Sequence, residues 1–226
     1  MKHILILFIT FCFFSCGNEK VLQLPEINHS KITDIDDISP AYLFYDLEKD
    51  SIELNRQNLI STTNWLVNVD KRLTLKLVIP QIKFLQNKKK RAGHKKEGIK
   101  NYYTCNDTSR KNLGFIEFTE TVYHEETSAN YLSKLSNIND SQNSITINFD
   151  KNNKITIVNG VLKSNISNST KENLLINLKK LDTLNGIIFL NFDETLNFQD
   201  YISYKSLIEK ADLTETKISN NEFIFN

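Results

Sequence analysis

The sequence has few of the residues on which several familiar classes of protein depend. Its 226 residues include only 6 glycines, 3 prolines and 3 cysteines. So few cysteines argue against a disulfide scaffold, and so few glycines argue against a glycine-rich phosphate-binding loop. The net charge is only +1, although 24% of the residues are charged and 40% are hydrophobic. That balance is typical of a globular protein and excludes a wholly disordered chain and a polytopic membrane protein.

No apolar run reaches the roughly 20 residues that a membrane-spanning helix needs. The longest, over residues 4–14, follows Lys2 and ends at Ser15-Cys16-Gly17. Its length and flanks predict a secretory signal peptide over residues 1–15. The small residue before Cys16 resembles the lipobox of bacterial lipoproteins, although phenylalanines stand where that motif usually has leucine and a small residue. The resemblance implies cleavage before Cys16 and lipidation of its thiol.

Cleavage before Cys16 changes the charge of the mature chain. It removes Lys2 and no acidic residue, so the mature chain has no net charge. Such a chain has no general attraction to nucleic acid. Gly17, rather than aspartate, follows Cys16, which in lipoproteins of this type favours the outer membrane, facing the periplasm. The sequence therefore predicts a bacterial envelope protein that acyl chains hold on a membrane.

Cys105 is the one cysteine left once Cys12 departs with the signal peptide and Cys16 takes the lipid. A lone cysteine is more often a small buried apolar residue than a nucleophile. A catalytic thiol also needs a nearby base, which His124 could supply only if the fold brought it close. The sequence therefore favours a protein that is not an enzyme, with an envelope hydrolase using Cys105 and His124 as the alternative.

Metal-ligating residues are present but scattered. His124-Glu125-Glu126 could join a zinc site, yet no second histidine lies at helical spacing from it. The aspartates within residues 34–37 are spaced like part of a calcium loop but lack its glycine and distal glutamate. The sequence therefore predicts no metal site and no cofactor.

The densest charge in the chain is positive. It comprises Lys88, Lys89, Lys90, Arg91, Lys95 and Lys96. Leu85 is the last apolar residue at helical spacing, so we expect the run to extend off a helix end, where cations suit the helix dipole. These six residues are candidates for binding an anionic surface, either lipid or envelope polymer. The alternative is a solvated, flexible loop.

An internal repeat organises the chain. Alternating apolar residues predict strands over 41–45, 51–54 and 65–69. Residues 73–85 fit both a strand and a helix, and Pro80 would interrupt either one. Residues 66–79 match residues 189–202 in register, and the second copy is plainly helical from residue 198. Both copies therefore predict a strand, a turn that contains aspartate (Asp70 or Asp193) and a helix.

The second copy has the fuller setting. We expect strands over 144–149, 154–158, 187–192 and 222–225 and helices over 172–181 and 198–211, in the order ββαβαβ. This order, with Asp193 ending a strand before an aromatic-rich helix, resembles the periplasmic domain of the ExbD/TolR biopolymer-transport family. The resemblance covers residues 144–226 and implies the fold of that domain. It does not imply a proton channel, because residues 4–14 contain no acidic residue.

Together these patterns predict an α+β protein of two small sheet-plus-helix lobes. The expected divisions are a signal peptide (1–15), a lipidated cysteine with a polar tether (16–40), an N-terminal lobe (41–127), a connecting segment (128–143) and a C-terminal lobe (144–226). Residues 102–107 are expected to form an aromatic and polar loop. The predicted function is a non-enzymatic binding or accessory module for an envelope protein or a cell-wall polymer. The oligomeric state is left open.

Overall fold

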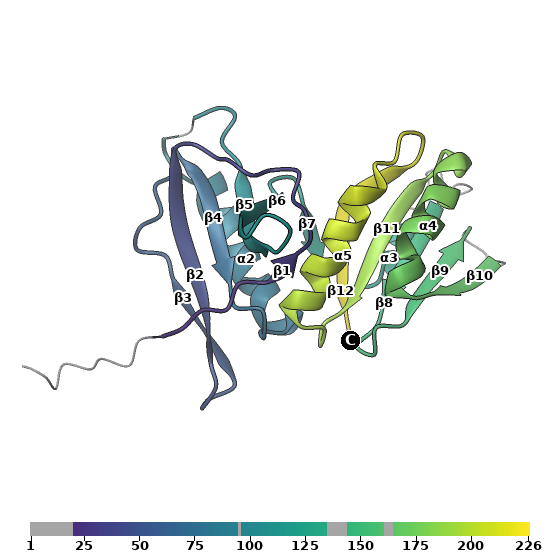
Figure 1. The fold of residues 1–226 in the computed structure, drawn as a ribbon, viewed down its shortest axis with the longest axis horizontal. Helices are drawn as coiled ribbons and strands as arrows, with labels where there is room; N and C mark the ends of the chain where they lie inside the picture. Colours follow the sequence, from purple (N-terminus) through teal and green to yellow (C-terminus); the bar gives the residue numbers. More distant parts are fainter. Residues whose placement is uncertain (1–19, 95, 135–143, 161–164) are drawn as a thin grey trace, which may run out of the picture.

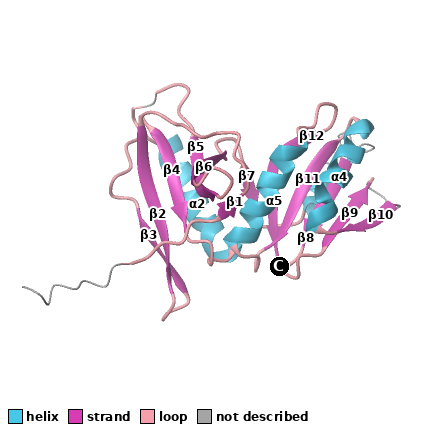
Figure 2. Ribbon diagram, in the orientation of Figure 1, coloured by secondary structure: helices cyan, strands magenta, loops and turns pink. Residues whose placement is uncertain are grey.

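The computed structural model describes residues 20–94, 96–134, 144–160 and 165–226. They form two lobes, each with a six-stranded sheet (Figure 1). Helices and strands mix in both lobes, which confirms the predicted α+β class (Figure 2). The predicted signal peptide, Cys16 and Lys95 lie outside the described residues.

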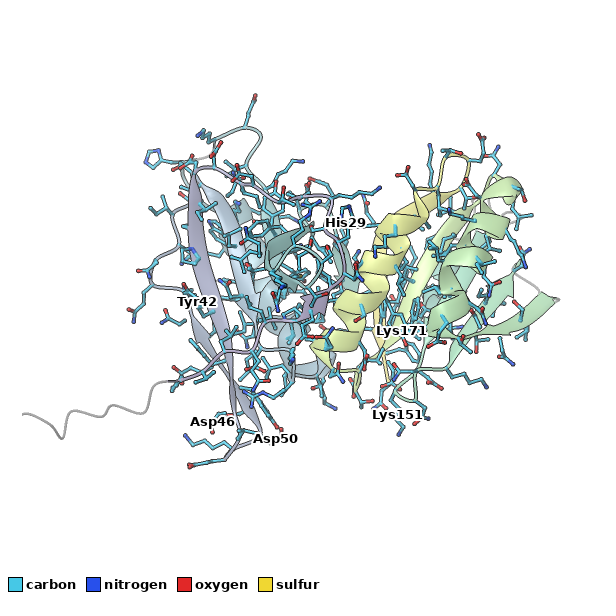
Figure 3. The ribbon with its side chains drawn as sticks, viewed as in Figure 1. His29, Tyr42, Asp46, Asp50, Lys151 and Lys171 are labelled. Atoms are coloured by element: carbon cyan, nitrogen blue, oxygen red, sulfur yellow. The ribbon has the colours of Figure 1, made fainter. Side chains whose placement is uncertain are left out.

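The first sheet has the strand order β3-β2-β4-β5-β6, and β1 also pairs with β5. Its bounds are β1 (Glu26–Ile27), β2 (Ile38–Asp46), β3 (Ser51–Asn55), β4 (Asn64–Val69), β5 (Asn101–Asp107) and β6 (Asn112–Glu117). β2, β4, β5 and β1 run parallel, whereas β3 and β6 are antiparallel to their neighbours. Figure 3 shows Asp46 and Asp50 at the tip of the β2–β3 hairpin. The expected loop at residues 102–107 is wrong, because those residues form β5.

Helix α2 (Leu75–Lys90) covers the inner face of the first sheet and contains Pro80. Its apolar side chains at helical spacing are buried: Leu75, Val78, Ile79, Ile82 and Leu85. Each such side chain contributes about 1.5–3 kcal/mol, whereas a proline inside a helix costs about 3 kcal/mol. Pro80 therefore does not end the helix, contrary to the prediction, because the buried face outweighs it.

The second sheet has the strand order β10-β9-β8-β11-β12-β7. Its strands are β7 (Val122–His124), β8 (Ser144–Phe149), β9 (Ile155–Asn159), β10 (Asn165–Ser169), β11 (Ile187–Asp193) and β12 (Lys217–Phe225). Its helices are α3 (Ser128–Lys134), α4 (Lys171–Leu181), the short 3-10 helix η2 (Asp182–Leu184) and α5 (Phe198–Ala211). The predicted ββαβαβ order lacks β10. β7, which the sequence assigns to the first lobe, pairs with β12 of the second.

Helices lie against both faces of β11. On one face, Phe192 stacks on Phe149 at 4.8 Å between ring centroids and meets Tyr201 of α5 edge-on at 5.0 Å. On the other face, the backbone N–H of Ser128, the first residue of α3, donates to the side chain of Asn191 at 3.0 Å. The expectation that helices cover one face of each sheet therefore fails at α3, which belongs to the predicted connecting segment.

The two copies of the internal repeat meet at a reciprocal backbone pairing that we call the seam. The N–H of Leu75 donates to the carbonyl of Leu196 at 2.9 Å, and the N–H of Phe198 donates to the carbonyl of Leu73 at 2.7 Å. A second reciprocal pair flanks the first: Lys76 N–H to Glu194 O, and Gln199 N–H to Lys71 O. Matching positions of the two copies thus bond to each other, and the predicted strand-turn-helix units are confirmed in β4–α2 and β11–α5.

The predicted tether is wrong from Lys20 onward, because the chain there packs on the body. The N–H of Gln23 donates to the Asp70 carboxylate at 3.2 Å, and the N–H of Ser30 donates to the Asp107 carboxylate at 2.8 Å. Between these points β1 pairs with β5. Figure 1 shows this purple segment crossing to β1, beside the second lobe, and returning to the start of β2. Asp70 and Asp107 are both fully buried and hold it there.

One hydrophobic core runs through both lobes. At its centre the Tyr103 ring stacks on Phe118 at 4.0 Å and meets Phe198 and Tyr201 of α5 edge-on, at 5.1 and 6.3 Å. α5 therefore contacts aromatic residues of both sheets. None of the helices in the described ranges is long and apolar enough to cross a membrane.

Candidate functional site

The basic run begins on α2 and not beyond it. Lys88, Lys89 and Lys90 form the last turn of the helix, and the N–H of Arg91 donates to the carbonyl of Asn87 at 3.1 Å. The expectation that the run extends off the helix end is therefore wrong for these lysines. Lys88, Lys90 and Arg91 are exposed and have no acidic partner within the described ranges. They leave three unneutralised positive charges at the carboxyl end of α2, where the helix dipole favours them.

Lys89 has a structural role instead. Its Nζ donates to the carbonyl of Lys100 at 2.9 Å and to Oδ1 of Asn101 at 2.8 Å, and it lies 4.9 Å from the centroid of the Trp65 ring. Burial lowers the pKa of Lys89 to about 8. The two oxygens and the ring face favour the charged form and oppose that shift. Lys89 thus ties α2 to the start of β4 and β5 and is not available to a partner.

The remaining predicted residues are partly neutralised or outside the described part. Lys96 forms an exposed ion pair with Asp37 at 2.8 Å. Lys95 is not among the described residues. Of the six candidates for anionic binding, the structure therefore leaves Lys88, Lys90 and Arg91 as free cations at the carboxyl end of α2.

Arg56, just after β3, lies beside Lys88 although nothing in the sequence singles it out. Its guanidinium carbon lies 4.8 Å from the centroid of the Phe84 ring on α2, one helical turn before Lys88. Arg56 is exposed and has no acidic partner in the described residues, and Phe84 is 44% exposed. The cation–π contact holds the guanidinium over the ring. Arg56 was missed because its position depends on a contact between two distant segments.

A hollow of about 460 Å³ lies between β3 and the end of α2, and we call it the β3 groove. It is lined by Glu53, Leu54, Asn55, Arg56, Gln57, Leu59 and Lys88. The one carboxylate in this lining, Glu53, is paired with Lys20. Arg56 and Lys88 therefore give the groove a positive character.

A second hollow, of about 530 Å³, lies beside β10 and α4. Its lining is Asn168, Ser169, Thr170, Asn173, Ile176, Asn177 and Lys180. The single cation among these residues gives it much less charge than the β3 groove. It offers a useful control surface on the other lobe.

The structure does not assemble the alternative catalytic pair. Cys105 is fully buried in the hydrophobic core, and burial raises the pKa of its thiol, whereas a nucleophilic cysteine needs a lowered one. The Nε2 atom of His124 is 2.8 Å from Oδ1 of Asn221, and its ring stacks on Phe223. Within the described residues, no hydrogen bond joins Cys105 and His124.

Titratable residues that the sequence analysis overlooked form a buried hydrogen-bonded chain between the lobes. The hydroxyls of Tyr103 and Tyr123 are 2.7 Å apart, and those of Tyr123 and Tyr201 are 3.3 Å apart. Tyr201 donates to Glu222 at 2.7 Å, and Lys205 pairs with the same carboxylate. Burial raises the pKa of all three tyrosines. The chain is enclosed, so it ties β5, β7, α5 and β12 together.

No group of metal-ligating side chains that could hold an ion occurs within the described ranges. Asp70 directly follows β4, and Asp193 is the last residue of β11. Asp70 accepts two hydrogen bonds from the Arg72 guanidinium at 2.8 Å each, and Asp193 accepts one from the backbone of Thr195 at 2.8 Å. Both are turn formers, as the sequence indicates.

No protein-family model matches the chain, and no curated protein or solved structure matches it. The resemblance of residues 144–226 to the periplasmic domain of the ExbD/TolR family therefore stays a prediction, as does the lipobox at Cys16.

Proposed function

We propose that this chain is a lipid-anchored protein of the bacterial envelope that binds an anionic partner without catalysing a reaction. The observation that carries the proposal is the set of four exposed cations at or beside the carboxyl end of α2, Arg56, Lys88, Lys90 and Arg91, none of which has an acidic partner in the described residues. Surface lysines and arginines are commonly neutralised by nearby acids, as Lys96 is by Asp37. Unpaired cations near one end of a helix attract anions.

The anchor would hold the body close to a membrane. Four peptide units separate Cys16 from Lys20, which span at most about 14 Å. Gln23 is bound at the carboxyl end of β4 through Asp70, whereas α2 runs back toward the amino end of that strand. A 16-residue helix is about 24 Å long, so Lys90 lies well away from the anchored end. Lys20, however, pairs with Glu53 in the lining of the β3 groove, so the groove itself lies close to the point of attachment.

The burial of Cys105 supports a binding role over hydrolysis. A buried thiol with a raised pKa is a poor nucleophile, and the His124 ring is occupied by Asn221 and Phe223. The alternative of an envelope hydrolase that uses these two residues therefore has no support in the geometry.

Two measurements test the proposal. Metabolic labelling with a fatty-acid probe should label the wild type but not the Cys16→Ser variant, and an unlabelled wild type would contradict the anchor. For binding, the purified full chain is titrated with polyglutamate and with polyphosphate at low and high salt. The variant Lys88→Gln/Lys90→Gln/Arg91→Gln should bind both probes more weakly than the wild type.

The matched control removes three exposed lysines from the second lobe: Lys151, Lys179 and Lys180. Figure 3 shows Lys151 on that lobe. The control loses the same net charge, so it separates a local surface from general electrostatics. Equal loss of binding in both triple variants, or wild-type binding in the α2 variant, would contradict the proposed function.

A further inference from the structure

β3 is an edge strand, and its outer side is open. In the described residues β3 pairs only with β2, through the register Leu43↔Leu54 and its neighbours. An edge strand presents a row of unpaired N–H and C=O groups to which another extended chain can pair. The β3 groove lies directly along this edge, because residues 53–55 of the strand line it.

The side chains beside this edge define what an added strand would meet. Leu54 packs against the core, so the face of β3 that carries it is the face toward α2. On α2, next to the groove, the ring of Phe84 is 44% exposed. Arg56 and Lys88 flank that ring with their free cationic ends.

We propose that the β3 groove binds an extended acidic segment of a partner protein, which adds a strand to the free edge of β3 and places carboxylates at Arg56 and Lys88. This inference rests on the proposed function and names the class of its partner. Alternate residues of a strand point to the same face and lie about 6.6–6.8 Å apart. The segment would therefore direct an apolar residue at Phe84 and acidic residues at the two cations from alternate positions.

The ion pair between Glu53 and Lys20 contributes to this selectivity. Glu53 is the one carboxylate in the groove lining, and Lys20 neutralises it. An acidic segment therefore meets two free cations and little electrostatic repulsion from the groove. A basic segment would meet uncompensated like charges at Arg56 and Lys88, which disfavours it.

The test uses the purified full chain and a fluorescent peptide, Thr-Glu-Thr-Val-Thr-Glu-Thr, with binding followed by anisotropy. We expect the peptide to bind and hydrogen exchange to slow at the β3 amides but not at those of β10, an edge strand of the other sheet. Arg56→Gln and Lys88→Gln should each weaken binding about fivefold, as the loss of one exposed charge contact predicts. Phe84→Ala should weaken it as well, whereas Lys96→Gln should leave it unchanged.

Two peptide controls separate strand pairing from charge alone. Replacement of both glutamates by lysine should abolish binding. N-methylation of alternate backbone nitrogens keeps the charge but blocks strand pairing, so it too should abolish binding. If the methylated peptide binds as well as the parent, the strand-addition inference is overturned.

The outcomes also distinguish this inference from the proposed function. If polyglutamate or polyphosphate binds through Lys88, Lys90 and Arg91 but the strand peptide does not, the inference fails and the proposed function stands. If vesicles of anionic phosphatidylglycerol bind through the same residues and the peptide does not, the partner is a membrane and the inference fails. If none of these probes binds, both fail.

Discussion

Asp107 is the side chain on which the attachment of the N-terminal segment most depends. Its carboxylate is fully buried, and its two oxygens serve different donors. Oδ1 accepts from the N–H of His29 at 3.0 Å and from the N–H and hydroxyl of Ser109 at 3.0 and 2.6 Å. Oδ2 accepts from the N–H of Ser30 at 2.8 Å. The carboxylate thus joins residues 29–30 to the end of β5.

The substitution Asp107→Asn removes the charge and one acceptor while it preserves the shape. If the amide oxygen keeps the Oδ1 contacts, the amide nitrogen must face the N–H of Ser30, which becomes a buried donor without a partner. A hydrogen bond to a charged group is worth about 1.5–3 kcal/mol, and an unsatisfied buried group costs about 1–3 kcal/mol. We therefore expect the free energy of unfolding to fall by about 3–5 kcal/mol.

The pH dependence of this loss gives a sharper test. Burial acts to raise the pKa of Asp107, but the Ser109 hydroxyl and the N–H groups of Ser30 and His29 outweigh it and hold the pKa well below its usual range. A carboxyl whose pKa is lower in the folded state stabilises the protein above its unfolded pKa of about 4, and the stabilisation fades as the pH falls below that value. The gap between wild type and variant should therefore narrow in acid.

Urea unfolding at several pH values measures the gap, and hydrogen exchange at the Ser30 amide reports the local contact. A loss below about 1 kcal/mol near neutral pH would refute the reasoning, because it is less than a single hydrogen bond to a charged group. A gap that stays constant down to about pH 2 would show that ionisation of Asp107 does not contribute.

Three further predictions follow from buried contacts. A methyl group on Gly114 would lie 2.6 Å from Cβ of Ser30. Gly114→Ala should therefore lower the free energy of unfolding by about 1–3 kcal/mol and make the segment before residue 38 more sensitive to proteolysis. Unchanged proteolysis would contradict the close packing. Glu222 is buried, and Glu222→Gln leaves the largely buried side chain of Lys205 without a carboxylate. The free energy of unfolding in urea should fall by about 3–5 kcal/mol, and a loss no larger than that of the exposed control variant Glu120→Gln would argue against a buried ion pair. Cys105 should resist a thiol reagent in the native protein and react on unfolding, and rapid native labelling would show that the core is open.

Local pattern predicted much of the fold. β8 and α5 have the bounds that the sequence gives them, and β4 with α2 follows the internal repeat. These elements are amphipathic and bury a regular face, so periodicity identifies them. β5 was missed because nearly all its residues are buried on both faces, which removes the alternation that marks a half-exposed strand. β10 was missed because Asn, Ser and Ile at an exposed edge carry little strand signal.

The sequence predicts only part of the candidate site. The cluster of lysines identifies a basic surface, but which of its members are free depends on residues distant in the chain. Trp65 and Asn101 engage Lys89, and Asp37 engages Lys96. Arg56 enters the site through Phe84, a contact between two segments that no local pattern links. Tertiary contacts of this kind decide the chemistry of a surface after local structure is set.

The seam has a consequence for how the molecule behaves at low protein concentration. Leu73, Leu75, Leu196 and Phe198 make the kind of mutual, symmetric contact that two separate subunits would make across a two-fold axis. Here both sides belong to one polypeptide, so their local concentration is fixed by covalent linkage. Dilution therefore cannot separate the two halves of the seam. A single copy of the chain already contains a symmetric contact that two separate subunits could form only by associating.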